Sequence, residues 1–189
     1  MKIGIYGGSF NPVTKAHLEV MWAAAPYVDE LWVMPVKSHP WDKSLAPYEH
    51  RWKMLELALP QVPRWHTNVS LVTGNNGPTV DVMNKLRHGH DDDEYMVVIG
   101  SDNAMKIKEW TDYKRLCLEN RFIIVARTEN MCIDSSLFHG SIIVLNKNCV
   151  HADCATYVRA YVLRKDWKQA NKSSVPAVVK YIKKEGLYK

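Results

Sequence analysis

The sequence predicts an α/β fold in which a parallel sheet is covered by helices on both faces and followed by a helical C-terminal segment. Two observations predict it. Short apolar runs typical of buried strands alternate with amphipathic stretches typical of helices over most of the chain. Strands separated by helical segments imply β–α–β units, in which neighbouring strands run parallel. The last apolar run is followed only by helical patterns, which predicts the C-terminal segment.

The first strand is expected at Lys2–Tyr6, and Gly7 and Gly8 are expected to end it in a turn that allows close backbone approach. Thr14 is a residue type that caps helices, so a helix is expected to begin after it. The apolar residues that give this helix its periodicity are Leu18, Met21, Trp22 and Ala25. A strand, a glycine turn and a helix in this order are typical of a nucleotide-binding fold.

The later elements follow the same alternation. Strands are expected at Glu30–Val36, Val69–Val72, Tyr95–Ile99, Phe122–Ala126 and Ile142–Leu145. Helices are expected at Tyr48–Leu59, Val80–Arg87, Asn103–Ile107, Ala155–Leu163 and Val175–Glu185. Ser174 is expected to cap the last helix and Gly186 to end it. No repeat or linker divides the sequence, so residues 1–189 are expected to form one domain.

Composition excludes several classes of protein. Hydrophobic residues make up 47% and charged residues 24%, which is ordinary globular usage and excludes fibrous and disordered classes. The N-terminus lacks the long hydrophobic region of a signal peptide, and no apolar run is long enough to span a bilayer. These features predict a cytoplasmic protein with no membrane contact. The four cysteines form no C-x-x-C pair and are interpreted as reduced thiols.

No metal site is predicted. His88, His90 and Asp91–Asp93 have suitable ligand types, but they fall in a polar stretch between a predicted helix and strand and are interpreted as a solvated turn. The net charge of +5 is concentrated in the last third of the chain, which suits an anionic ligand or a solvated basic face. For the terminal lysines, a solvated basic face is the favoured interpretation. Nucleic-acid binding is not predicted, because no aromatic platform accompanies the charge.

Polar loops follow four of the predicted strands, where ligands of open parallel sheets bind. These loops contain Gly7–Phe10, Pro35–Lys43, Gly100–Asp102 and Arg127. In the first, glycines allow backbone N–H groups to approach a phosphate, and a helix N-terminus favours negative charge. Thr14 and His17 lie one helical turn apart at that end, so His17 can donate to a phosphate oxygen. The alternative is an ordinary turn, a plain cap and a surface histidine.

This segment resembles the nucleotidyltransferase superfamily that carries G-x-F-x-P followed by H/T-x-G-H. The matching residues are Gly8, Phe10, Pro12, Thr14 and His17, with Ala16 in place of the usual glycine. The resemblance implies a Rossmann-like fold and a site for ATP. The threonine form also occurs in phosphopantetheine adenylyltransferases, so the segment indicates the superfamily rather than the substrate.

The stretch Gly100–Trp110 resembles the I-G-x-D…W segment of nicotinate and nicotinamide mononucleotide adenylyltransferases. Glycine leaves room for a nucleotide, Asp102 can accept hydrogen bonds from a ribose, and Trp110 can stack on a flat ring. The alternative is that Asp102 caps a helix and Trp110 fills the core. The resemblance implies that Asp102 lies at the adenosine side and Trp110 on the pyridine.

Further matches extend the resemblance over nearly the whole chain. Lys43 lies where that family has a lysine-bearing substrate loop, although the usual P-H-K is Trp41–Lys43 here, and Arg51 belongs to its R-x-x-M-L helix. Thr79 matches the start of a helix that, in that family, contacts the carboxylate or amide group of the pyridine. The alternative is that Thr79 only caps the helix. Arg127 matches a strand-end arginine that contacts phosphate or fixes a loop.

The segment Cys154–Arg159 resembles the family's S-S-T-x-I/V-R signature, a helix start that holds the outer phosphates of ATP. Thr156 and Arg159 are retained, whereas the two serines are Cys154 and Ala155. Two hydroxyl donors are therefore lost while the backbone N–H groups and the guanidinium remain. The ending Pro176–Tyr188 resembles that of the pyridine-nucleotide enzymes, and Val178, Val179 and Ile182 are its candidates for the core.

The resemblance implies an enzyme that transfers AMP from ATP to nicotinate or nicotinamide mononucleotide, with Mg²⁺ carried by the ATP phosphates. The implied catalytic residues are His17, Thr14 and Lys43. The implied ATP-binding residues are Gly7, Gly8, Ser9, Phe10, His17, Gly100, Asp102, Arg127, Thr156 and Arg159. The implied mononucleotide-binding residues are Lys43, Thr79 and Trp110. Two alternative functions stay open, a phosphopantetheine adenylyltransferase-like enzyme and a non-catalytic nucleotide sensor. The assembly of the chain into a homo-oligomer also stays open.

Overall fold

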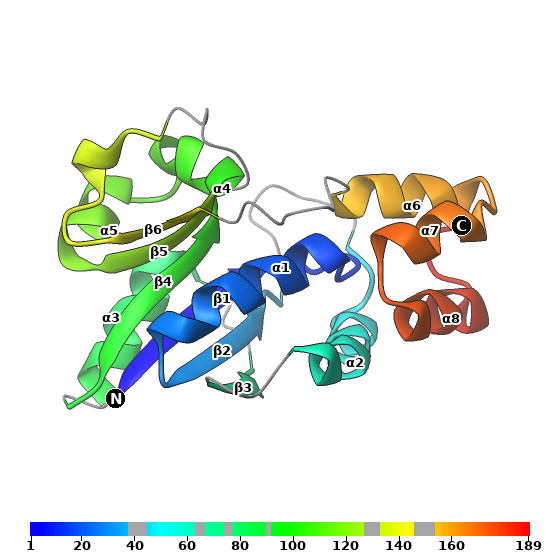
Figure 1. The fold of residues 1–189 in the computed structure, drawn as a ribbon, viewed down its shortest axis with the longest axis horizontal. Helices are drawn as coiled ribbons and strands as arrows, with labels where there is room; N and C mark the ends of the chain where they lie inside the picture. Colours follow the sequence, from blue (N-terminus) through cyan, green and yellow to red (C-terminus); the bar gives the residue numbers. More distant parts are fainter. Residues whose placement is uncertain (38–44, 63–66, 74–76, 90–91, 127–132, 146–153) are drawn as a thin grey trace.

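The structure is a computed structural model that describes residues 1–189 except for six segments, 38–44, 63–66, 74–76, 90–91, 127–132 and 146–153. Its centre is a parallel sheet with helices on both faces (Figure 1). The strands are β1 (Lys2–Gly8), β2 (Glu30–Pro35), β3 (Asn68–Leu71), β4 (Glu94–Gly100), β5 (Arg121–Ala126) and β6 (Ile142–Leu145).

The strand order is β3-β2-β1-β4-β5-β6, and all these neighbours pair in parallel. The predicted parallel sheet is therefore confirmed. The strand order reverses between β1 and β4, which lie side by side although a long stretch of chain separates them. Loops after these two strands leave the sheet in opposite directions, so a crevice forms at their carboxyl ends.

The helices are α1 (Lys15–Ala24), α2 (Tyr48–Ala58), α3 (Thr79–Gly89), α4 (Ser101–Met105), α5 (Tyr113–Glu119), α6 (Ala155–Leu163), α7 (Trp167–Ser173) and α8 (Pro176–Glu185). Short 3₁₀ turns lie at η1 (Ala25–Tyr27), η2 (Leu59–Gln61), η3 (Ile107–Glu109) and η4 (Ser135–Leu137). The sequence did not predict α5 or α7. Each has 7 residues, too few for a helical period to stand out.

Two local expectations are wrong. Gly7 and Gly8 do not end β1 but belong to it, where they pair with Met34 and Pro35 of β2. Ser174 does not cap α8, which begins after Val175 with a proline in its first turn. The Ser174 hydroxyl instead donates to the carbonyl oxygen of Val13 at 2.7 Å. A tertiary acceptor therefore takes the group that the sequence assigned to a local cap.

Side chains of successive strand residues point to opposite faces of the sheet and pack into two separate hydrophobic cores. In β4, Met96 and Val98 pack under α1, α2 and the C-terminal helices, whereas Val97 and Ile99 pack under α3, α4 and α5. The predicted core residues of α8, Val178, Val179 and Ile182, are buried in the first core. Gly186 ends α8 at φ 66°, as predicted. Figure 1 shows α6, α7 and α8 grouped beside α2 at one end of the molecule.

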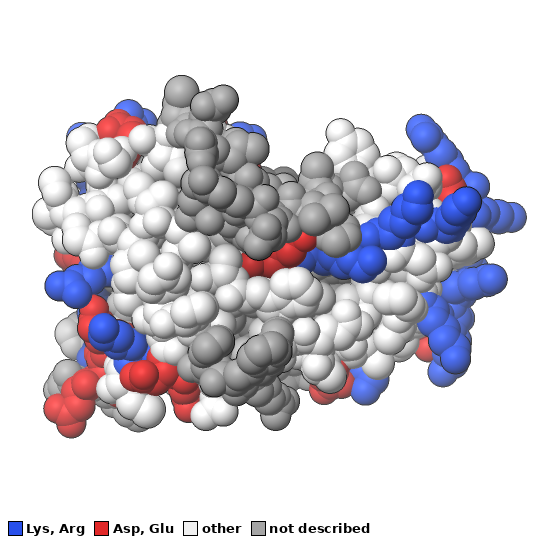
Figure 2. Space-filling model, in the orientation of Figure 1, with Lys and Arg blue, Asp and Glu red and all other residues white. Residues whose placement is uncertain are grey.

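Lysine and arginine side chains gather over the C-terminal helices at one end of the molecule, whereas both signs of charge are mixed elsewhere on this face (Figure 2). Exposed members of this group are Arg164, Lys168, Lys172, Lys180 and Lys184. In the part of the chain that the structure describes, none of the helices has the length and apolar character needed to cross a membrane.

Candidate active site

A pocket opens at the carboxyl ends of β1 and β4, where α1 begins near the start of α6 (Figure 1). Three segments that are far apart in the sequence contribute to it. Its lining residues are Tyr6, Thr14, Ala16, His17, Val20, Gly100, Asp102, Asn103, Cys154 and Ala155. The structure therefore brings three segments to one place. They are the loop between β1 and α1 (residues 9–14, the first loop) with the start of α1, the Gly100–Asp102 segment and the start of α6.

The hydrogen bonds of His17 determine which of its nitrogens carries a proton. The backbone N–H of Thr14 donates to Nδ1 of His17 at 3.0 Å, and the Thr14 hydroxyl lies 2.9 Å from the same nitrogen. A nitrogen that accepts a backbone N–H carries no proton, so the proton of the neutral imidazole is on Nε2. Thr14, confirmed as the cap of α1, thus makes Nε2 of His17 a donor.

Phe10 holds the imidazole from the side. Its ring is fully buried and meets His17 edge-to-face, with ring centroids 5.1 Å apart, and Tyr6 in the same manner at 5.4 Å. Gly8 makes room for this ring, because a Cβ there would lie 3.1 Å from the Phe10 ring edge. The backbone of Phe10 has φ 45°, a conformation that costs a non-glycine residue roughly 1–3 kcal/mol.

Asn11 connects this loop to the rest of the molecule. Its side-chain oxygen accepts the N–H of Ala46 at 3.0 Å and the hydroxyl of Tyr188 at 2.8 Å. Its backbone oxygen accepts Nη1 of Arg159 at 2.6 Å. This role could not be predicted from the sequence, since the Asn-Pro pair at Asn11 indicates only a turn.

Arg51 is a second residue that the sequence did not place near the site. Its side chain is 1% exposed and lies on α2. The guanidinium donates to three carbonyl oxygens, those of Ser9 at 2.8 Å, Ala46 at 2.9 Å and Lys37 at 3.1 Å. Burial lowers the pKa of Arg51, yet the ordinary pKa of an arginine is so high that the guanidinium stays charged. It therefore fixes the first loop relative to the two ends of the β2–α2 connection.

Asp102 lies exposed at the rim of the pocket, directly after β4. A Cβ on Gly100 would lie 2.6 Å from a carboxylate oxygen of Asp102, so a side chain at Gly100 would displace this carboxylate. At the opposite wall, Cys154 is the cap residue of α6 and carries an exposed, free thiol. Arg159 donates to the hydroxyl of Thr156 at 3.2 Å as well as to Asn11.

Thr79 and Trp110 lie on the other side of the sheet. Trp110 is half-buried and packs against the second core, which also contains Val80 and Met83 of α3. Thr79 is the first residue of α3 rather than a cap before it. Neither residue lines the pocket that contains His17.

Lys43 and Arg127 lie outside the described residues. Among the residues that the structure does describe, no three His, Cys, Asp or Glu side chains are close enough to hold a metal ion. The carboxylate of Asp102 lies at the rim of the pocket, and the guanidinium of Arg159 on α6 lies beside the loop between β1 and α1, where it donates to the backbone oxygen of Asn11.

Comparison with known proteins agrees with this geometry. The cytidylyltransferase-like family matches residues 5–178. A Myxococcus xanthus protein named "Probable nicotinate-nucleotide adenylyltransferase" is 32% identical over 67% of this chain and 69% of its own. A protein of the same name from Anaeromyxobacter dehalogenans is 29% identical over 100% of this chain and 97% of its own.

Among solved structures, Plasmodium falciparum nicotinic acid mononucleotide adenylyltransferase complexed with NaAD superposes with a TM-score of 0.83 at 26% identity. The match covers 99% of this chain and 97% of that one. The fold thus agrees with that of this solved structure over nearly the whole chain. The chain belongs to the nicotinate-nucleotide adenylyltransferases, within the cytidylyltransferase-like family.

Proposed function

We propose that this chain transfers the AMP group of ATP to nicotinate mononucleotide or nicotinamide mononucleotide, forming deamido-NAD or NAD and releasing pyrophosphate. The observation that carries the proposal is the pocket at the carboxyl ends of β1 and β4, which His17, with its proton on Nε2, lines together with the start of α6. The names of the relatives favour the nicotinate form. ATP enters as its Mg²⁺ complex, and the ion belongs to the substrate.

In the reaction, a phosphate oxygen of the mononucleotide attacks the α-phosphorus of ATP, and the bond to the bridging oxygen of pyrophosphate breaks. Negative charge builds up on the α-phosphate oxygens and on the leaving group. Nε2–H of His17 donates to an α-phosphate oxygen, and the tautomer needed for this is the one that Thr14 enforces. Catalysis is then a matter of positioning and electrostatic stabilisation.

The other groups hold the substrates. Gly7, Gly8, Ser9 and Phe10 shape the first loop, and Gly100 and Asp102 receive the adenosine at the opposite side of the crevice. The start of α6, with Thr156 and Arg159, takes the outer phosphates. Arg159 already lies against Asn11, so a phosphate there also touches the first loop. Trp110, Thr79, Lys43 and Arg127 remain predictions of the resemblance, with the first three at the mononucleotide.

Detection of pyrophosphate tests the proposal most directly. The protein is supplied with ATP and, separately, with nicotinate mononucleotide, nicotinamide mononucleotide or phosphopantetheine. Release with a pyridine mononucleotide supports the proposal, and release only with phosphopantetheine supports the alternative enzyme. Binding of ATP without release under any condition would support a non-catalytic sensor, which the loss of two hydroxyls at Cys154 and Ala155 motivates.

Replacing Trp110 by alanine is expected to raise the KM for the mononucleotide and leave the KM for ATP nearly unchanged. Stacking of one flat ring on an aromatic side chain is worth roughly 1–3 kcal/mol. Initial rates at varied concentrations of each substrate measure both constants. The matched control is Trp22→Ala, since Trp22 is 44% exposed on α1 and does not line the pocket. Equal increases in both constants for Trp110→Ala would contradict the stacking role.

Alkylation of Cys154 is expected to be slowed by Mg²⁺-ATP, because the thiol lines the pocket at the start of α6. Iodoacetamide labelling with peptide mass mapping measures the rate at each cysteine. Cys117 is the internal control, since it is buried and burial raises the pKa of its thiol, which lowers the thiolate fraction. Equal labelling of Cys154 with and without ATP would place the outer phosphates elsewhere.

A further inference from the structure

We propose that Tyr188 is a positioning residue for adenylyl transfer, whose hydroxyl acts through Asn11 to hold the loop between β1 and α1 in the shape that presents His17. The proposal rests on the proposed function for its kinetic consequence. Its structural basis is one hydrogen bond between residues 177 positions apart, from the Tyr188 hydroxyl to Oδ1 of Asn11 at 2.8 Å.

The orientation of the Asn11 amide is fixed independently of Tyr188. The N–H of Ala46 donates to the same side-chain atom at 3.0 Å, and only the oxygen of an amide can accept from a backbone N–H. The Tyr188 hydroxyl must therefore be the donor in its bond with Asn11. Burial raises the pKa of Tyr188 well above its usual range, against the opposing effect of Arg159 and Arg51. The phenol thus keeps its proton at any pH at which the protein works.

Side chains from distant elements bind the main-chain carbonyl groups of this loop. The carbonyl oxygens of Ser9, Asn11 and Val13 each accept a hydrogen bond from a residue outside the loop. The donors are Arg51 of α2, Arg159 of α6 and Ser174 before α8. Among the described contacts, Tyr188 differs from these donors in holding the side chain of Asn11 rather than the main chain.

The backbone is strained near both partners of the Tyr188–Asn11 hydrogen bond. This strain indicates that tertiary contacts impose the backbone conformation there. Phe10, beside Asn11, has φ 45°, and Tyr188 has φ 62°. Aromatic residues rarely adopt positive φ, and such conformations persist only where surrounding contacts enforce them. Phe10 in turn meets the His17 ring edge-to-face at 5.1 Å. A shift at Asn11 is therefore passed to the imidazole through its immediate neighbour in the chain.

The test compares Tyr188→Phe with Tyr181→Phe. Each substitution removes one phenolic hydroxyl from the C-terminal segment and keeps the ring. The Tyr181 hydroxyl bonds to Nδ1 of His50 on α2 at 2.8 Å, away from the loop. We expect Tyr188→Phe to lower kcat about three- to tenfold, which corresponds to one hydrogen bond between neutral groups. The KM values of both substrates should stay within about twofold, and Tyr181→Phe should retain wild-type kcat.

A second measurement needs no turnover. Hydrogen–deuterium exchange of the peptide covering residues 9–14 should be faster in Tyr188→Phe than in the wild type and unchanged in Tyr181→Phe. Asn11→Ala should lower kcat as well, and adding Tyr188→Phe to it should cause little further loss, because both remove the same bond.

The two measurements separate failure of this inference from failure of the proposed function. If the wild type makes no dinucleotide, the function is wrong, and the exchange experiment still decides the role of Tyr188. Equal kcat in Tyr188→Phe and Tyr181→Phe, or equal exchange of residues 9–14 in both variants, would overturn the inference. So would additive losses in the double variant.

Discussion

Replacing His17 by alanine is expected to lower kcat by a factor on the order of 10² to 10³, the usual cost of losing one donor that stabilises charge in the transition state. The reason is geometric. The imidazole is held by Thr14 on one side and by the Phe10 ring on the other, so its remaining N–H has a fixed direction. A donor fixed before the reaction needs no reorganisation when charge develops on the α-phosphate.

His17→Gln divides this effect into two parts. A glutamine side chain keeps an N–H donor and has a carbonyl oxygen that can accept the Thr14 N–H, but it lacks the ring that packs against Phe10. We expect it to recover part of the activity lost in His17→Ala, and to show a similar melting temperature. Steady-state rates with saturating ATP and mononucleotide measure kcat for both variants.

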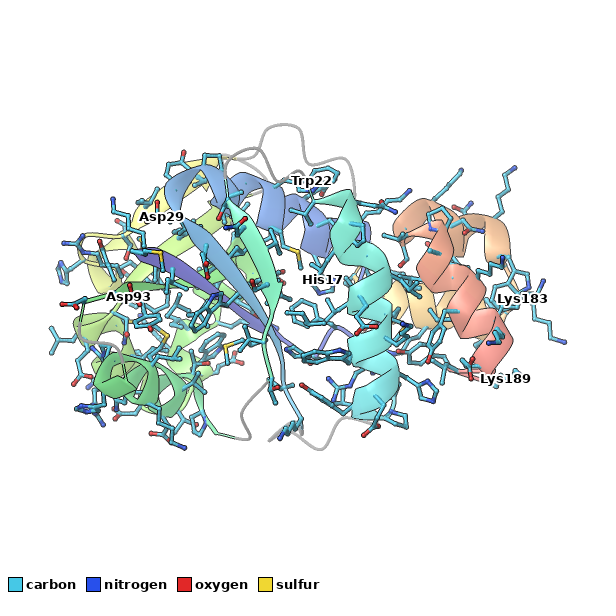
Figure 3. The ribbon with its side chains drawn as sticks, turned by 90° about the horizontal axis from the view of Figure 1, so that it is seen from below. His17, Trp22, Asp29, Asp93, Lys183 and Lys189 are labelled. Carbon is cyan, nitrogen blue, oxygen red and sulfur yellow. The ribbon has the colours of Figure 1, made fainter. Side chains whose placement is uncertain are left out.

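The control for this series is His139→Ala, since His139 is exposed and lies just after η4 rather than at the pocket. Its kcat should match that of the wild type. Figure 3 shows His17 between the sheet and the C-terminal helices, so the two histidines test different parts of the molecule. Wild-type kcat in His17→Ala would refute the assignment of His17 to the α-phosphate.

The sequence was sufficient to predict the parallel sheet and the meeting of its strand-end loops. Both depend on local patterns, because apolar runs define strands and parallel strands end at one edge. Thr14, His17, Gly100 and Asp102 meet at one pocket for this reason. The local errors arose where a tertiary contact replaced a local preference, as when Ser174 bound Val13 instead of capping α8.

The contacts that fix the first loop left no comparable signal in the sequence. Arg51 lies 42 positions from Ser9, Arg159 lies 148 from Asn11, and Tyr188 lies 177 from Asn11. No spacing rule connects residues so far apart. An arginine on a helix is ordinarily a surface residue, and only the folded chain shows that Arg51 is buried against three carbonyl oxygens.

Arg51→Met is expected to give the largest loss of stability among the substitutions considered for this protein. Methionine fills a similar length but donates nothing, so the carbonyl oxygens of Ser9, Lys37 and Ala46 lose a donor. These bonds are part-buried, and a hydrogen bond to a charged group contributes about 1 kcal/mol or more, which gives roughly 3 kcal/mol for the set. For a chain of this size that lowers the melting temperature by roughly 6–12 °C. Thermal unfolding followed by circular dichroism measures it.

Arg51→Lys separates charge from geometry. Lysine keeps the positive charge but has a single nitrogen, which cannot reach three carbonyl oxygens in the fixed arrangement of a guanidinium. Its melting temperature should therefore fall between those of Arg51→Met and the wild type. Arg115→Met is the control, because Arg115 is exposed on α5 and, in the described part of the chain, bonds to Glu119 of its own helix alone. Exposed pairs of this kind contribute little, so its melting temperature should stay near that of the wild type.

Arg51→Met should also lower kcat at temperatures at which the variant is still folded. Arg51 holds Ser9 of the first loop against Lys37 and Ala46, which lie near the two ends of the connection between β2 and α2. Without it, the distance between the two loops is no longer fixed, and a transfer that depends on alignment of two phosphates should slow even at temperatures where the chain is folded. A stable Arg51→Met variant with wild-type kcat and melting temperature would show that the loops keep their spacing by other means.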